Sequence, residues 1–299
     1  MIELSNISMT YGNVKSLEEV SAKLEDGTIF GLIGSNGSGK STLLRIMAGV
    51  MRPDNGEVCY DGAQVYENPP AKQQIIYLSD EQYFLPHGTI NDMRMLYKSV
   101  YTNFSDKMFK KMRDIFKLDC DRKLNTFSKG MKKQASVMLG VSAMPKYLLC
   151  DETFDGLDPV VRQLVKRIFA EETADRGMTA VIASHNLREM EDICDTVGLL
   201  HKGELLFVRG LDDMKTELHK VQMVFGDDFD AERLRGLTIM RYERRGSLVT
   251  FIARGDETEL NEFLRRLAPT FFETIPLTLE EIFICEMEER GYDFGKLIY

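Results

Sequence analysis

Gly34-Ser35-Asn36-Gly37-Ser38-Gly39-Lys40-Ser41 fits the pattern G-x-x-x-x-G-K-[ST], a glycine-rich loop with a lysine and a hydroxyl at fixed positions. An apolar, strand-like run precedes it at residues 28–33, and residues 42–48 read as a helix that stops at Gly49. Backbone N–H groups in such a loop curl around an anion, and the N-terminus of the following helix adds positive potential. A glycine-rich turn without function would rarely match this residue pattern and also lie between a strand and a helix. The stretch therefore predicts a phosphate-binding loop.

Side chains at the end of this loop indicate the ligand. Lys40 supplies a full positive charge for the β- and γ-phosphates of a nucleotide, and the hydroxyl of Ser41 is placed to bind Mg²⁺. We count Thr42, the next residue, among the nucleotide-binding residues together with the whole loop.

A second apolar run ends in two carboxylates, because Asp151 and Glu152 follow residues 147–150. A Mg²⁺ ion bound to phosphates needs a carboxylate at the end of a neighbouring strand, which Asp151 can supply. Glu152 is well placed to orient or deprotonate an attacking water. Alone, such a run is more often a strand that meets solvent, so this interpretation depends on the loop upstream.

The order of the expected elements indicates an α/β fold. Residues 147–150 and 179–183 read as strands, and the apolar stripe between them, at 161–169, has helical spacing. Strand, helix, strand predicts a parallel sheet. From about residue 85 to 145 the apolar period is helical, which predicts an inserted helical subdomain.

We expect two domains along the chain, one at residues 1–210 and a small accessory domain at residues 211–299. Strands and helices there follow the order βαββαβ, the α+β pattern called split βαβ, with helices at 230–234 and 257–267. A last helix opens at the capping box Thr278-Leu279-Glu280-Glu281. The stretch contains no phosphate or metal motif.

The composition indicates a folded protein and limits the classes of partner that it can bind. Lys and Arg total 38 against 47 for Asp and Glu, which argues against a protein that binds nucleic acid mainly through phosphates. The five cysteines form no C-x-x-C pair, so we expect free thiols. No apolar run reaches the length of a membrane span, and the N-terminus resembles neither a signal nor a transit peptide, so we expect a cytoplasmic protein.

A short motif makes a family resemblance specific. Phe127-Ser128-Lys129-Gly130-Met131 resembles Leu-Ser-Gly-Gly-Gln, the signature of the ATP-binding cassette (ABC) ATPases, at the place where that family has it. Ser128 and Gly130 match, and the backbone N–H groups that open a helix there can face a phosphate. Lys129 and Met131 differ from the usual signature, and the resulting sequence is similar to that of bacterial export-type subunits. Over residues 1–210 the resemblance implies a P-loop NTPase core with a parallel sheet, an antiparallel β subdomain and a helical subdomain.

Three further matches follow in the order of the family. Tyr11 resembles the aromatic residue that stacks on adenine. Asp155-Gly156-Leu157-Asp158-Pro159 resembles the D-loop, in which Asp158 would reach across a dimer. His185 resembles the switch histidine that contacts the γ-phosphate. Taken alone, an exposed tyrosine or a histidine after a strand more often has no such role.

Residue 80 departs from the family, which usually has glutamine at this position of its Q-loop. Here Asp80 stands there and Gln82 comes two positions late. A carboxylate can accept a hydrogen bond from a metal-bound water, but it cannot donate one unless it is protonated. We expect Asp80 to join Ser41 and Asp151 as a Mg²⁺ ligand, and either Asp80 or Gln82 could fill the Q-loop role.

The resemblance implies an ATPase that uses ATP and Mg²⁺ to power transport, with Glu152, His185 and Lys40 as catalytic residues. In the family two subunits meet head to tail, so ATP would lie between the loop of one and Ser128 and Gly130 of the other. The implied partners are that second ATP-binding subunit, identical or different, and an integral membrane permease on another chain. The permease would hold the protein at the inner face of the cell membrane, and no nucleic acid is expected.

Two other functions stay open at this point. A soluble ABC ATPase acting in translation or on nucleic acid would have tandem cassettes, long coiled coils or zinc insertions, and the sequence has none of them. The acidic charge is a further objection. A non-catalytic nucleotide-binding regulator would be expected to lack one of four residues that are all present here: Lys40, Asp151, Glu152 and His185.

Overall fold

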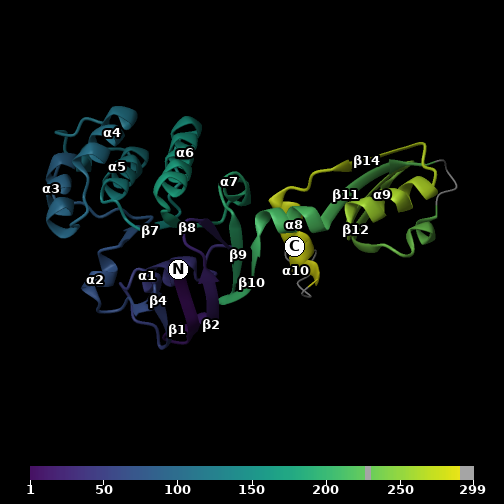
Figure 1. Ribbon diagram of the computed structural model, residues 1–299, viewed down its shortest axis with the longest axis horizontal. Coiled ribbons are helices and arrows are strands. Elements are labelled where there is room, and N and C mark those ends of the chain that lie inside the picture. The colour runs from purple at the N-terminus through teal and green to yellow at the C-terminus, as the bar shows by residue number, and fades with distance from the viewer. Residues whose placement is uncertain (226–229, 290–299) are drawn as a thin grey trace. The chain divides into compact units, whose positions relative to one another are not determined.

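A computed structural model describes residues 1–225 and 230–289 of the chain (Figure 1). By their contacts the residues divide into two compact units, Met1–Val208 and Arg209–Tyr299. No helix within the described ranges is both long and apolar enough to span a membrane.

A six-stranded sheet forms the centre of the first unit. Its strand order is β10 (Glu204–Gly210), β9 (Thr196–His201), β3 (Ile29–Ile33), β8 (Thr179–Ser184), β7 (Tyr147–Asp151) and β6 (Ile75–Leu78). All pairings from β9 to β6 are parallel. Every residue of β3, β7 and β8 is buried, as expected for strands covered on both faces by helices and loops. The parallel sheet that the sequence predicts is therefore confirmed.

An antiparallel sheet in the same unit has the order β2, β1, β4, β5. The strands are β1 (Ile2–Tyr11), β2 (Val14–Leu24), β4 (Asn55–Tyr60) and β5 (Ala63–Gln64). Its buried residues share one apolar core with β3, β7 and helix α1 (Lys40–Met47). This core fixes α1, and with it the phosphate-binding loop, between the two sheets.

Helices between β6 and β7 form the inserted helical subdomain (Figure 1). They are α3 (Ile90–Val100), α4 (Asp106–Phe116), the 3₁₀ turn η1 (Leu124–Thr126) and α5 (Lys129–Ser142). Side-chain caps start the three α-helices: Thr89 and Asp92 form a capping box on α3, and Ser105 and Ser128 cap α4 and α5. Three further helices in the first unit are α2 (Pro69–Lys72), α6 (Pro159–Arg176) and α7 (Leu187–Glu191).

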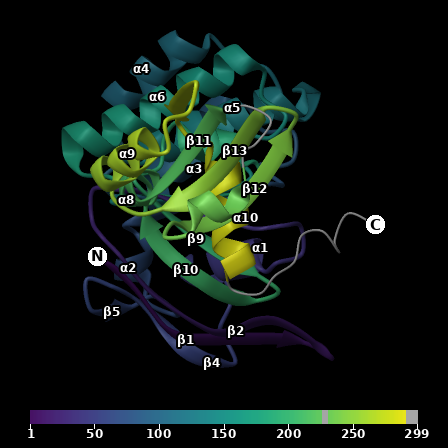
Figure 2. The same cartoon turned by 90° about the vertical axis from the view of Figure 1, so that its right-hand side faces the viewer.

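The second unit has a four-stranded antiparallel sheet of order β12, β13, β11, β14, the arrangement of a split βαβ fold. Figure 2 shows β11, β13 and β12 side by side. Its elements are α8 (Leu211–Glu217), β11 (Leu218–Val224), η2 (Ala231–Leu234), β12 (Thr238–Arg245), β13 (Leu248–Arg254), α9 (Glu257–Arg266), β14 (Phe271–Ile275) and α10 (Leu279–Glu289).

Two details of this unit differ from the sequence prediction. The first helix of the pattern is only one 3₁₀ turn, η2, because the stretch is four residues long and an α-helix of that length has almost no internal hydrogen bonds. Helix α8 precedes the pattern and was not predicted. The expected capping box is present, because Thr278 and Glu281 exchange hydrogen bonds at the start of α10.

Candidate active site

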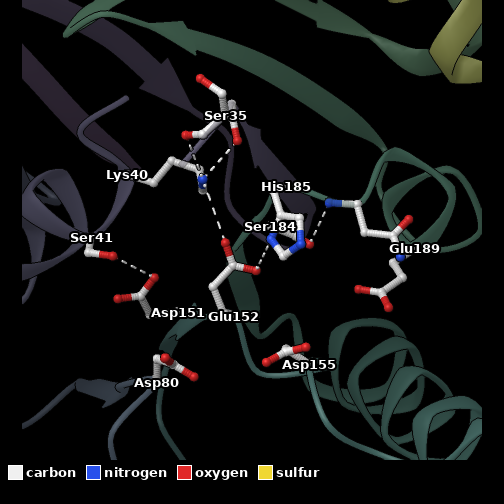
Figure 3. A network of polar contacts seen from close by, with 12 residues as sticks. Ser35, Lys40, Ser41, Asp80, Asp151, Glu152, Asp155, Ser184, His185 and Glu189 are labelled. Atoms are coloured by element: carbon white, nitrogen blue, oxygen red, sulfur yellow. Dashed lines mark hydrogen bonds and ion pairs between the residues drawn. The ribbon is translucent and has the colours of Figure 1, made fainter. Parts of the chain in front are cut away.

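The predicted site residues meet at one edge of the central sheet. The phosphate-binding loop follows β3, Asp151 ends β7, His185 follows β8, and Asp80 lies two residues after β6. Parallel strands present their carboxyl ends at the same edge, where ligands of open α/β sheets bind. Figure 3 shows these side chains facing one another.

The loop itself is shaped for close approach of an anion. Gly39 has φ +108°, and a Cβ there would lie 2.4 Å from the carbonyl oxygen of Ser16. At Gly37, with φ +79°, a Cβ would meet nothing within 4 Å. Lys40 is buried and its ammonium donates to the carbonyls of Gly34 at 2.8 Å and Ser35 at 3.2 Å. A positive charge is therefore held inside the curl of the loop.

Ser41 and Asp151 form the part of the site suited to a cation. The Ser41 hydroxyl donates to Oδ1 of Asp151 at 3.0 Å, and the Tyr77 hydroxyl donates to Oδ2 at 3.1 Å. Burial raises the pKa of Asp151, and these two hydrogen bonds oppose the rise. Among the described residues no group of three or more His, Cys, Asp or Glu could hold a metal by itself. A hydroxyl with one carboxylate fits Mg²⁺ that takes its other ligands from phosphate and water.

Glu152 points into the same space. Its Oε2 lies 3.0 Å from Nδ1 of His185 and its Oε1 lies 3.6 Å from Nζ of Lys40 (Figure 3). The backbone of Glu152 is left-handed, with φ +46°, a conformation that a non-glycine residue adopts only when its surroundings hold it there. Such strain is frequent at catalytic positions.

Lys40, Ser41 and Glu152 line a cavity of about 320 Å³ together with other loop residues, Thr42 and Asp80. Asp151 and His185 are not part of its lining. Ser16 also lines it and donates to the Thr42 hydroxyl at 3.0 Å. No sequence motif marks Ser16, so only the folded chain identifies it. A larger hollow of about 710 Å³ lies in the second unit and contains none of the predicted site residues.

Four predicted nucleotide contacts outside the phosphate-binding loop, Tyr11, Ser128, Gly130 and Asp158, do not line this cavity. Ser128 accepts a hydrogen bond from the backbone of Met131 and so caps α5. Asp158 caps α6 in the same way. Tyr11 is half-exposed at the end of β1, and its hydroxyl lies 3.3 Å from Sδ of Met51.

The two Q-loop candidates have different surroundings. Asp80 lines the cavity, and its Oδ1 lies 3.0 Å from Nζ of Lys133, a residue that no sequence motif marks. The side-chain amide of Gln82 donates to the carbonyls of Ser79 and Asp80 at 3.0 and 2.7 Å. Gln82 therefore serves the turn of its own loop.

Comparison with known proteins agrees with this geometry. The family model described as ABC transporter matches residues 17–155. The ABC transporter ATP-binding protein YtrB of Bacillus subtilis is 33% identical over 96% of this chain and 98% of its own length. The methionine import ATP-binding protein MetN of Carboxydothermus hydrogenoformans is 29% identical over 69% of this chain and 65% of its own length.

Solved structures are similar as well. One described as the ATP-binding subunit of an ABC transporter has a TM-score of 0.67 and 26% identity over 72% of this chain and 92% of its own. The cassette MJ0796, solved as a dimer in a post-hydrolysis state with ADP and Pi, has a TM-score of 0.65 and 20% identity over 71% of this chain and 99% of its own, which shows a shared fold. A phosphate-binding loop facing paired carboxylates, with a relative matched over nearly its whole length, places the chain in the ABC transporter family as an ATP-binding subunit that hydrolyses ATP.

Proposed function

We propose that ATP is hydrolysed with Mg²⁺ in the cavity next to the phosphate-binding loop, with Glu152 as the general base. The observation that carries this proposal is the position of the Glu152 carboxylate, between Lys40 and His185 at the edge of the cavity. Lys40 and the loop N–H groups would bind the phosphates, and Ser41 and Asp151 would hold the cation. Mg²⁺ bound there would neutralise charge on the phosphates.

Glu152 would orient a water for attack and take its proton. A carboxylate within reach of both a lysine and a histidine is fixed in direction, so little reorganisation is needed when water and phosphate approach. The His185 contact holds Oε2, and Lys40 faces Oε1. Three other predicted contributors lie outside the cavity: Ser128 and Asp158 cap their helices, and Gly130 lies in the first turn of α5. We propose that they complete the site of a second ATP-binding subunit, as the family resemblance implies.

The second partner in this proposal is a membrane permease. Residues 79–88 form the loop after β6, and this loop packs on α3, where the Leu85 N–H lies 3.4 Å from Sδ of Met93. The same loop and helix expose large apolar side chains, with Tyr83 78% and Met95 66% exposed. Exposed apolar groups of this kind are frequent at protein interfaces. A segment of the permease is the occupant we propose for them.

We propose export as the direction of transport. The signature around Lys129 resembles the export-type form. The relatives compared are transport proteins by name, which favours transport over a role in translation or on nucleic acid.

Two assays test the proposal. The purified full chain should hydrolyse ATP with Mg²⁺ and lose that activity in EDTA, and equal rates in both would contradict the metal assignment. The chain reconstituted in liposomes with its membrane partner, with ATP outside, should move into the lumen a cargo that stimulates its ATPase activity. Movement out of the lumen would show import instead.

A further inference from the structure

Lys133, on helix α5, is the least exposed charged side chain among the described residues, at 1%. Its ammonium donates to the backbone carbonyl of Glu152 and lies 3.0 Å from Oδ1 of Asp80. A buried ammonium is costly unless such partners compensate it. We propose that Lys133 is a positioning residue for ATP hydrolysis, which ties the loop at Asp80 to the backbone of Glu152. The inference rests on the proposed role of Glu152 as general base.

The backbone of Glu152 needs such support. Its left-handed conformation is unfavourable for a residue with a side chain. The N–H of Glu152 donates to Ala183 of β8 at 3.0 Å, and its carbonyl accepts the N–H of Asp155 at 3.2 Å as well as the Lys133 ammonium. The lysine is thus the contact through which α5, the helix that begins at Ser128, holds Glu152 in place.

Asp80 supplies the counter-charge. Its side chain is 43% exposed and lines the cavity, while Lys133 reaches it from within the fold. Lys129, one turn earlier on α5, lies 3.7 Å from the same oxygen but is 59% exposed, so its contribution is small. A shift of the loop at Asp80 therefore acts first on Lys133, and through Lys133 on Glu152. This contact would transmit the loop's position to the catalytic carboxylate.

Replacement of Lys133 by methionine in the full chain tests the proposal. Methionine keeps most of the length and removes the charge and the donors. We expect kcat to fall about tenfold or more while the KM for ATP changes less than about threefold, because the loop that binds the phosphates is untouched. Lys133→Arg should recover part of the lost kcat, because it keeps a cationic donor. Asp80→Asn combined with Lys133→Met should cost less than the product of the two single losses, as expected for groups in contact.

Lys166→Met is the matched control. Lys166 is also a buried lysine, 6% exposed, but its ammonium pairs with Asp192 at 3.0 Å and not with Asp80 or Glu152. Its loss should lower the melting temperature and leave kcat within about twofold. The proposal is wrong if Lys133→Met keeps the native kcat, if kcat and ATP affinity fall together, or if Lys166→Met loses as much kcat. Should Lys133→Met not fold, the Lys133→Arg variant decides by the same split of kcat and KM, measured against the native chain.

Glu152→Gln separates this inference from the proposed function. An active Glu152→Gln variant would overturn the role of Glu152 itself. An inactive Glu152→Gln variant beside a fully active Lys133→Met variant would overturn the role of Lys133 alone.

Discussion

The ammonium nitrogen of Lys40 lies 3.6 Å from Oε1 of Glu152, so the charges proposed to bind phosphate and to activate water face each other across one cavity. Both side chains are largely buried, at 6% and 16% exposed. A phosphate group entering the loop would compete with Glu152 for Lys40, which links nucleotide binding to the freedom of the proposed base.

Glu152→Gln should lower the ATPase rate by about a hundredfold or more and leave ATP binding intact. The amide keeps the shape but removes the base and a negative charge next to the γ-phosphate. We also expect an ATP-bound dimer to accumulate, which light scattering would detect. Glu204→Gln, at an exposed position on β10, is the control and should behave as the native chain. A monomeric Glu152→Gln variant with native turnover would exclude the assignment.

Lys40→Ala should weaken ATP binding itself, by about tenfold or more, because it removes the only full charge inside the curl of the loop. Titration calorimetry with ATP measures this directly. Unchanged affinity would mean that the phosphates bind elsewhere.

Two glycines of the loop should differ in their tolerance of a methyl group. Gly39→Ala would drive a Cβ to 2.4 Å from the Ser16 carbonyl and should abolish ATP binding. Gly37→Ala meets nothing within 4 Å and should cost only the strain of a left-handed residue, about 1 kcal/mol. Thermal melting and ATP binding of both variants measure the contrast, and equal effects would contradict it.

Gln82→Ala should leave kcat and the KM for ATP within about twofold of native values. Both hydrogen bonds of its amide go to carbonyls of its own loop, whereas Asp80 lines the cavity. Steady-state kinetics of the two alanine variants, Asp80→Ala and Gln82→Ala, compare the candidates. A larger loss of kcat for Gln82→Ala would assign the Q-loop role to that residue.

A chain ending at Gly210 should fold and bind ATP. The buried cluster of β11, β13 and α9 is separate from the core that supports the phosphate-binding loop, and the cavity is lined entirely by residues before Gly210. Circular dichroism, cooperative melting and ATP titration test this. A truncated chain that folds but does not bind ATP would show that residues 211–299 contribute to the site.

Much of the fold and part of the site follow from local sequence patterns. The loop at 34–41, the apolar run ending at Asp151 and the capping box at Thr278 are set by residues within a few positions of one another, so a single sequence predicts them. The order of the split βαβ strands also follows, because few topologies connect such a series of elements.

The tertiary structure decided which residues that are far apart in the chain come into contact. The meeting of Lys133 with Asp80 and Glu152, and of Ser16 with Thr42, depends on how α5 and β2 pack against the sheet edge. The strands β9 and β10 were not predicted, and the short η2 replaces an expected helix, since packing rather than local propensity selects such elements. The sequence determined which chemical groups are available, and only packing determined which of them hold one another in place, because burial and partner distance are properties of the folded chain.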